Sequence, residues 1–231
     1  MSLLYVVATP IGNLEDITLR GLRILKEVNL IAAEDTRQTK ILLNKYEIKT
    51  PLTSYHKFNI RGKTSHLIDQ LKNGQTIALV TDSGLPAVSD PGWELISSAV
   101  VQGVRVEVIP GPSASLTALV VSGLPTEKFI FEGFLPKKQG KKRKVLEGLK
   151  YLSHTIIIYE SPFRVLKTLE EVQKIFGERE VAVCRELTKK FEEVIRGKAG
   201  DVIEQLKDRV IKGEVVLVVS GLKKVTQRER D

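Results

Sequence analysis

Short apolar runs alternate along this chain with longer segments in which apolar residues recur every three or four positions. Runs of the first kind, typical of buried strands, cover residues 4–8, 30–33, 76–80, 104–109, 129–131, 155–159, 181–184 and 215–219. Segments of the second kind, typical of helices with one buried face, cover residues 18–28, 36–46, 59–72, 92–102, 161–176 and 201–211. This alternation predicts an α/β chain folded as two sheets.

Neither an internal repeat nor a long linker divides the chain. The change from one sheet to the next is expected near Gly111–Pro125, and we place the boundary so that residues 1–112 form one lobe and residues 113–231 the other. At 231 residues the chain is long enough for two small domains.

Two turn-rich loops follow predicted strands. The sequence TDSGLPAVSDPG, Thr81–Gly92, follows the run at 76–80, and PGPSAS, Pro110–Ser115, follows the run at 104–109. In open α/β sheets, ligands bind just outside the carboxyl ends of the strands. The loops are therefore a plausible wall for a small-molecule cleft, although Pro-Gly-Pro could simply turn the chain and Asp82 and Asp90 could be turn and cap residues.

Positive charge is concentrated in the second half. Residues 111–231 hold 24 Lys and Arg against 17 Asp and Glu, a net of +7, whereas the whole chain carries +8. Six of the eight residues from Lys137 to Lys144 are basic. Such a cluster is a candidate contact for a phosphate backbone, with a solvated loop and helix start as the alternative. Because the rest of the chain is nearly neutral, we favour nucleic acid.

The composition argues against several other classes of protein. A single cysteine, Cys184, excludes an internal disulfide and favours a reducing, cytoplasmic setting. One cysteine and three scattered histidines leave little material for a zinc site, so no metal is expected. The apolar runs are too short to cross a membrane, and the N-terminus lacks the features of a signal peptide.

Familiar catalytic motifs fit poorly. Arg61–Thr64 resembles the end of a P-loop, but Lys57 occupies the position of its first glycine. The sequence Gly111–Ser115 resembles the nucleophile elbow of serine hydrolases and fails at its last position. His154 is badly placed for a triad, so a hydrolase is only a weak alternative.

Seven motifs in order carry a resemblance. They are ATPIGNL at 8–14, AEDTR at 33–37, SYH at 54–56, DSGLP with SDPG at 82–92, IPGPSA at 109–114, FEGFLP at 131–136 and YESPFR at 159–164. Together they resemble the ribosomal RNA small subunit methyltransferase I family, a branch of the tetrapyrrole methylase superfamily. The resemblance implies two α/β/α lobes with S-adenosylmethionine in a cleft between them, and a homodimer. It also implies 2′-O-methylation of a cytidine ribose (cytidine 1402) in the decoding region of 16S rRNA, within the small ribosomal subunit.

The resemblance also suggests which residues bind the cofactor. Strand-end loops would hold it, chiefly through backbone groups. The candidates in the first lobe and at the boundary are Pro10, Ile11, Asp82, Ser83, Gly84, Leu85, Pro86, Gly111, Ser113 and Ala114; those in the second lobe are Tyr159, Leu187 and Ser220.

A ribose hydroxyl is a poor nucleophile, so a base or a group that stabilises the developing oxyanion would help. Glu160 and Arg185, which end apolar strands, are the first candidates, with a structural ion pair as the alternative for each. Further polar candidates near strand ends are Asp35, His56, Lys57 and Glu186. The expected RNA contacts are Lys137, Lys138, Lys141, Lys142, Arg143, Lys144, Arg37 and Arg164.

Two other functions stay open. A tetrapyrrole methyltransferase would share the fold and cofactor but should lack the basic segment, and a non-catalytic RNA-binding protein would bind no S-adenosylmethionine. Longer members of the family carry a helical extension after the second lobe, which we expect to be absent here because the sequence stops at Asp231.

Overall fold

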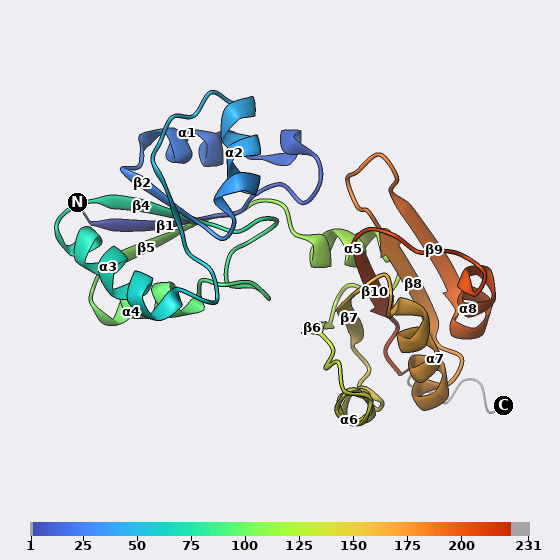
Figure 1. Cartoon of the computed structure of the whole chain (residues 1–231). Coiled ribbons are helices and arrows are strands. Elements are labelled where there is room, and N and C mark those ends of the chain that lie inside the picture. Colours follow the sequence, from blue (N-terminus) through green and yellow to red (C-terminus); the bar gives the residue numbers. More distant parts are fainter. Residues whose placement is uncertain (1, 223–231) are drawn as a thin grey trace. The chain divides into compact units, whose positions relative to one another are not determined.

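The computed structural model of the chain describes residues 2–222 (Figure 1). The chain divides into two compact units, Met1–Ser113 and Ala114–Asp231, so the division lies one residue from the expected boundary. None of the described helices is long and apolar enough to cross a membrane.

The first unit is built on a five-stranded sheet in the order β3-β2-β4-β1-β5, in which every neighbouring pair is parallel. Its strands are β1 (Leu3–Val7), β2 (Leu30–Ala33), β3 (Leu52–Ser54), β4 (Thr76–Val80) and β5 (Arg105–Ile109). Its helices are α1 (Leu19–Glu27), α2 (Thr36–Lys45), α3 (Ile60–Lys72) and α4 (Trp93–Val101), with a 3₁₀ turn, η1, at Leu14–Asp16.

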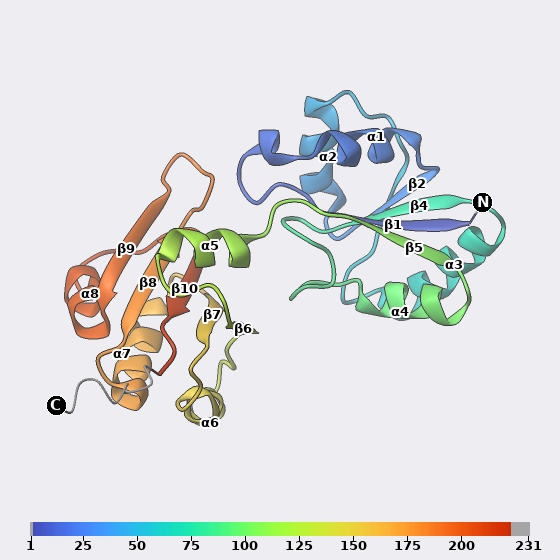
Figure 2. The ribbon, with the colours of Figure 1, turned by 180° about the vertical axis from the view of Figure 1, so that it is seen from behind.

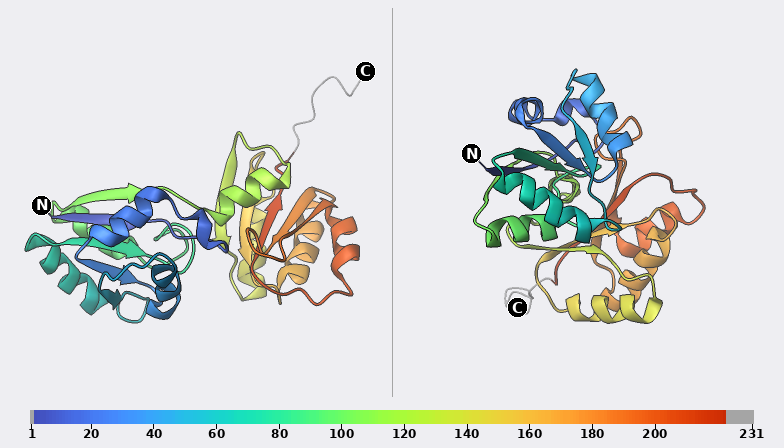
Figure 3. Two further views of the ribbon diagram at one scale, coloured as in Figure 1. Left: turned by 90° about the horizontal axis from the view of Figure 1, so that it is seen from above. Right: turned by 60° about the vertical axis from the view of Figure 1, so that its left-hand side comes forward.

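Helices cover both faces of this sheet. Helices α1 and α2 pack on one face and α3 and α4 on the other, as the views in Figures 1 and 3 show. The central strand β4 sends Ala78 and Val80 into the first core and Ile77 and Leu79 into the second. Strands buried on both faces are expected to be continuous apolar runs, and this explains why β4 could be read from the sequence.

The second unit contains a mixed sheet in the order β6-β7-β10-β8-β9. Strands β6 and β7 are parallel, whereas β10 runs antiparallel to both β7 and β8, and β9 antiparallel to β8. The strands are β6 (Phe129–Phe134), β7 (Thr155–Glu160), β8 (Glu180–Arg185), β9 (Glu193–Lys198) and β10 (Val215–Val219); the helices are α5 (Ala114–Ser122), α6 (Gln139–Leu149), α7 (Val165–Phe176) and α8 (Ala199–Leu206).

Its two faces are covered unequally. Side chains from α6, α7 and α8 form one core with the sheet, while α5 crosses the other face, in front of β8 and β10 in Figure 2. The single cysteine belongs to that second face: Cys184 is buried and its thiol lies 3.9 Å from the Ala118 carbonyl oxygen of α5. Burial raises the pKa of this thiol to about 12, which leaves it unreactive.

Two strands were not expected from the sequence, β3 and β9. Both are edge strands, and β3 is only three residues long with every residue half-buried. In β9, half-buried and exposed positions mix along the sequence EVIRGK. The helix expected over residues 201–211 also ends early, at Leu206. Edge elements bury too little apolar surface to show an apolar run, so their sequences look like loops.

A buried polar network lies between α6, α7 and the end of β7. The Glu160 carboxylate is fully buried and accepts hydrogen bonds from the Ser161 backbone N–H (2.8 Å) and the Thr168 hydroxyl (2.7 Å). It forms an ion pair with Arg164 at 3.3 Å. The Lys142 ammonium donates to the Thr168 hydroxyl at 3.2 Å. Each polar group of the network therefore has a hydrogen-bond or ion-pair partner, as buried polar groups require.

This network corrects two expected RNA contacts. Lys142 is only 6% exposed, so its charge faces the interior and not the surface that its neighbours share. Arg164 donates to the carbonyl oxygens of Leu135 (3.1 Å) and Pro136 (3.2 Å) as well as pairing with Glu160, so it is a clamp on the loop before α6. The sequence showed a continuous basic run and gave no sign that the helix turns one lysine inward.

We expect Glu160→Gln to destabilise the protein by about 2 kcal/mol or more, because breaking a buried ion pair leaves its partner uncompensated. The measurement is chemical denaturation followed by circular dichroism. Glu170→Gln, an exposed change on helix α7 outside the network, is the matched control and should have little effect. If the free energy of unfolding of Glu160→Gln equalled that of the control, the structural role of Glu160 would be refuted.

Candidate functional site

Five sequence motifs meet at one edge of the first sheet. Because all five strands are parallel, their carboxyl ends lie on the same side, and each is followed by a polar loop. The loops begin at Ala8 after β1, Glu34 after β2, Tyr55 after β3, Thr81 after β4 and Pro110 after β5.

The crevice expected at this edge lies between β1 and β4. The chain leaves β1 towards α1 on one face of the sheet and leaves β4 towards α4 on the other, so the two neighbouring strands diverge. Open α/β sheets bind their ligands at such a topological switch point, where two neighbouring strands lead to helices on opposite faces of the sheet.

Backbone segments approach one another closely here. Thr9 and Gly84 exchange backbone hydrogen bonds of 2.9 and 3.0 Å, which join the loops after β1 and β4. Gly84 has a φ of +80°, and a Cβ there would lie 3.7 Å from Ile11 and 3.9 Å from the Pro112 carbonyl oxygen. At Gly111 a Cβ would lie only 3.0 Å from that of Ala8. The structure thus brings together three of the loops predicted to hold a cofactor.

Acidic side chains gather beside these loops. The Thr81 hydroxyl, buried at the end of β4, donates to Glu34 at 2.6 Å and also lies within hydrogen-bond reach of Asp90. The Asp35 backbone N–H donates to Asp82 at 3.0 Å. A hydroxyl has one proton to give, so Thr81 cannot satisfy both Glu34 and Asp90 when both are ionised.

This crowding perturbs two carboxyl groups. Burial and then the charge of Glu34 raise the pKa of Asp90 to about 6, and the same two causes raise the pKa of Asp82. In contrast, hydrogen bonds from Arg37 hold the pKa of Asp35 at about 2. Carboxylates that are held close together at the edge of the sheet lower the stability of the folded protein. Groups with perturbed pKa values cluster at functional sites. The arrangement suits a ligand that carries positive charge or hydroxyl donors.

Sequence reasoning missed part of this cluster. It named Asp82 but treated Asp90 as a turn or cap residue and gave no role to Glu34 or Thr81. The signal lies in the order of the strands, because β2 and β4 are neighbours in the sheet. Leu30 pairs with Ile77 and Ala33 with Val80, so Glu34 and Thr81, which follow the two strands, lie side by side although they are far apart in the sequence. In residues 2–222 no group of three or more His, Cys, Asp or Glu side chains is placed to hold a metal ion.

The remaining first-unit candidates lie on the same edge. His56 follows β3, and its Nδ1 atom is buried without a partner among the described residues. Asp35 caps α2 and pairs with the exposed Arg37 at 2.6 Å. Ser83, Leu85 and Pro86 belong to the loop that carries Gly84. Ser113 ends the first unit and Ala114 begins α5 of the second.

One of the three second-unit candidates lies at a different edge of the sheet from the other two. Tyr159 and Leu187 lie near the ends of β7 and β8, but Ser220 follows β10, which runs the other way. Val215 at the start of β10 pairs with the ends of its neighbours and Val219 with their beginnings. Ser220 is therefore about 17 Å, five strand positions, from that edge. The prediction from strand ends assumed a parallel strand, whereas Ser220 lies at the opposite edge of this sheet from Tyr159 and Leu187.

Of the two first catalytic candidates, Glu160 is enclosed in the network described above, whereas Arg185 is half-buried. The Arg185 guanidinium pairs with Glu193 at 3.1 Å and donates to the Lys212 carbonyl oxygen at 3.3 Å. The ion-pair alternative weighed for each residue is therefore what the structure contains. Among the basic residues, exposed side chains remain at Lys137, Lys138, Lys141, Arg143 and Lys144, the fourth of them paired with Glu147.

Comparison with known proteins identifies the family to which the chain belongs. A sequence profile of the tetrapyrrole (corrin/porphyrin) methylases matches residues 3–203. The chain belongs to this family. The predicted α/β class and the two-lobe organisation of the tetrapyrrole methylase type are thereby confirmed.

Close relatives narrow the place of the chain within the tetrapyrrole methylases. It is 53% identical to the ribosomal RNA small subunit methyltransferase I of Halalkalibacterium halodurans, over 94% of this chain and 75% of the relative. It is 46% identical to the protein of the same name from Thermotoga maritima, over 96% of this chain and 99% of the relative. The predicted family resemblance is therefore confirmed.

Solved structures show how widely this family fold is used. A uroporphyrin-III-C-methyltransferase from Thermus thermophilus aligns with a TM-score of 0.66 and 20% identity, covering 95% of this chain and 94% of its own. A diphthine synthase aligns with a TM-score of 0.73 and 15% identity, covering 95% and 90%. At such low identity the likeness concerns the fold alone, because one fold hosts many substrates.

We expect Asp90→Asn to stabilise the protein at neutral pH. The folded pKa of about 6 lies above the usual 3.8, so this carboxyl's contribution to stability is full below about pH 4 and is lost as the pH rises past 6. The variant should exceed wild type by about 1 kcal/mol at pH 7, a value reduced for partial exposure, and match it at pH 4. Urea denaturation at both pH values measures the difference.

Asp69→Asn, an exposed change on α3 away from the cluster, is the control. Equal stability of Asp90→Asn and wild type at pH 7 would mean that the carboxylates do not repel one another.

Proposed function

We propose that the protein is an S-adenosylmethionine-dependent methyltransferase that methylates the ribose 2′-hydroxyl of a cytidine, cytidine 1402, in the decoding region of 16S rRNA. The observation that carries the proposal is the identity of 43–53% to proteins named ribosomal RNA small subunit methyltransferase I, over nearly the whole chain. Assembly as a homodimer and action in the cytoplasm belong to the same proposal.

The residues of the β1–β4 edge fit the cofactor chemically. S-adenosylmethionine offers a cationic sulfonium, an ammonium group and ribose hydroxyls, all of which interact favourably with carboxylates. Glu34, Asp82 and Asp90 supply carboxylates whose mutual repulsion a cationic ligand would relieve. Gly84 and Gly111 leave the backbone without side chains where the loops converge, so a ligand can approach main-chain groups.

When bound, the cofactor supplies an electrophilic methyl group. The protein's part is to orient the two reactants, which can contribute about 7–11 kcal/mol to lowering the barrier. A proton must also leave the ribose hydroxyl as the new carbon–oxygen bond forms. Asp90, with a pKa of about 6, is better matched to accept it near neutral pH than Asp35, whose pKa is about 2. We propose Asp90 in place of Glu160 as the first base to test.

The exposed lysines at the start of α6 would bind the RNA backbone. Lys137, Lys138, Lys141 and Lys144 are exposed, and the Arg164 clamp fixes the loop from which they project. Phosphate contacts of this kind position RNA without reading its sequence. Arg37, on α2 beside the cofactor edge, is a further candidate contact.

We expect the full chain to transfer labelled methyl from S-adenosylmethionine to 30S subunits isolated from cells that lack this modification. Mass spectrometry of the digested 16S rRNA should place one methyl on the 2′-oxygen of cytidine 1402. Methylation of uroporphyrinogen III with none on 30S subunits would favour a tetrapyrrole methyltransferase. Binding to 16S rRNA without binding of S-adenosylmethionine and without methyl transfer would favour a non-catalytic RNA-binding protein.

In the same assay Asp82→Asn should raise the KM for S-adenosylmethionine about tenfold or more, because hydrogen bonds to a charged group contribute about 1.5–3 kcal/mol. Asp69→Asn should leave it unchanged. If both variants behaved alike, Asp82 would not be a cofactor contact.

A further inference from the structure

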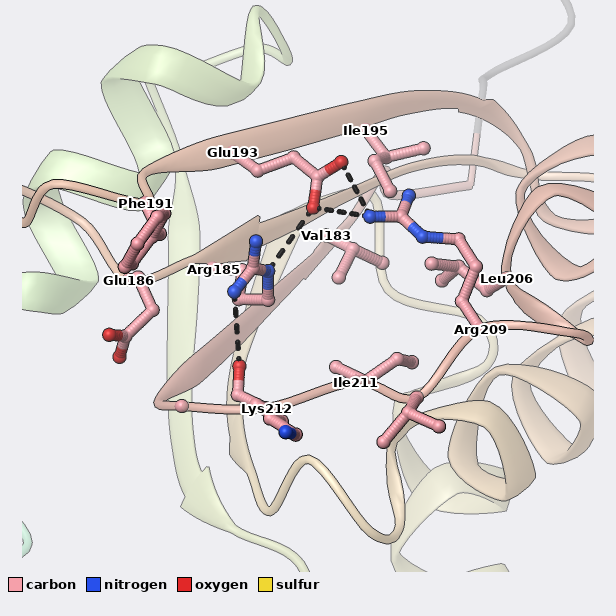
Figure 4. A pocket seen from close by; sticks show the side chains of 12 residues that line it. Val183, Arg185, Glu186, Phe191, Glu193, Ile195, Leu206, Arg209, Ile211 and Lys212 are labelled. Carbon is pink, nitrogen blue, oxygen red and sulfur yellow. Dashed lines mark hydrogen bonds and ion pairs between the residues drawn. The ribbon is translucent and has the colours of Figure 1, made fainter.

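The second unit contains a pocket that the proposed cofactor site does not use (Figure 4). It has a volume of about 290 Å³ and lies on the α7–α8 face, between the end of β8, the start of β9 and the segment that leads from α8 to β10. This is close to the lower end of the range for small-molecule pockets, about 300–1,000 Å³. The size suits one nucleotide unit better than a larger ligand.

The pocket has an apolar interior and a charged mouth. Five aliphatic side chains line it, from Val183, Ile195, Leu206, Val210 and Ile211. Two arginines stand at its edge, both held by Glu193: Arg185 at 3.1 Å and Arg209 at 2.8 Å to each carboxylate oxygen. Figure 4 shows this carboxylate between the two guanidinium groups. The arginines are thus fixed in position before any ligand arrives.

Positive charge remains after this pairing. Glu193 neutralises one of the two arginines, and the other lining carboxylate, Glu186, pairs with Lys189 at 3.0 Å. Lys212 adds a further exposed cation. Within residues 2–222, the Nε and Nη1 atoms of Arg209 donate to no other group, so they are available to an anion. Phe191, 66% exposed, stands at the same mouth and offers a flat aromatic face. An exposed phenylalanine beside fixed arginines is an arrangement used to bind single-stranded nucleic acid.

We propose that this pocket binds one unpaired nucleobase of the RNA substrate, with Phe191 against the base and Arg209 and Lys212 on its phosphate. The inference rests on the proposed RNA substrate but concerns a site separate from the carboxyl edge of the first sheet. RNA is read mainly through unstacked bases placed against aromatic and guanidinium groups. A base held here would fix the strand that carries the target ribose.

The test uses guanosine 5′-monophosphate and the full chain saturated with S-adenosylhomocysteine, so that the cofactor site is filled. In a nuclear magnetic resonance titration, amide signals of residues 183–213 should shift. Phe191→Ala should weaken binding at least about fivefold, the low end for loss of base–aromatic stacking. Phe163→Ala, which removes an 89% exposed phenylalanine elsewhere in the same unit, is the matched control and should bind as wild type does.

A second variant tests the phosphate contact. Wild type should bind guanosine 5′-monophosphate about tenfold more tightly than guanosine, and Arg209→Gln should remove most of that difference. The proposal is overturned if Phe191→Ala binds as tightly as Phe163→Ala, or if inorganic phosphate binds as well as the nucleotide. Methylation of 30S subunits without nucleotide binding would defeat the pocket alone, whereas nucleotide binding without methylation would defeat the proposed function alone.

Discussion

The parallel pairing of β1 with β4 is the constraint on which the rest of the first unit depends. It places the end of each strand beside the other, so that Thr9 and Gly84 can exchange backbone hydrogen bonds. Since α1 and α4 cover opposite faces, the chain segments that follow the two strands then diverge, and a ligand site is expected at this point. A shift of β4 by one residue would turn Thr81 to the other face of the sheet, away from Glu34.

The acidic cluster at this edge has a cost that the fold alone does not explain. The buried Thr81 hydroxyl has one proton for two carboxylates, Glu34 and Asp90, and burial and then the charge of Glu34 raise the pKa of Asp90. Proteins retain such destabilising arrangements where a ligand or a reaction needs them. In the second unit, by contrast, Glu160 is fully paired, and its network serves to hold the basic start of α6.

Much of the fold could be predicted because its central strands are buried on both faces and read as apolar runs. Strands β3 and β9 were missed because edge strands leave no such signal. Among the proposed cofactor contacts, Pro10, Ile11, Gly84 and Gly111 were chosen from their motifs, and the structure brings their loops together. The sequence did not show that Ser220 lies at the other edge of the sheet, because strand direction is not visible in an apolar run. It did not show that Lys142 is buried, because a basic run does not indicate which side chain turns inward. The surroundings of Asp90 could not be predicted without the order of the strands, because only the pairing of β2 with β4 brings Glu34 close to it.

The central claim is that the carboxylates at the β1–β4 edge bind the methyl donor. A crystal structure of the full chain with S-adenosylhomocysteine tests it most directly. The account predicts that a hydroxyl or amino group of the ligand lies within about 3.2 Å of a carboxylate oxygen of Glu34, Asp82 or Asp90. A ligand bound without contact to any of these three residues would contradict it.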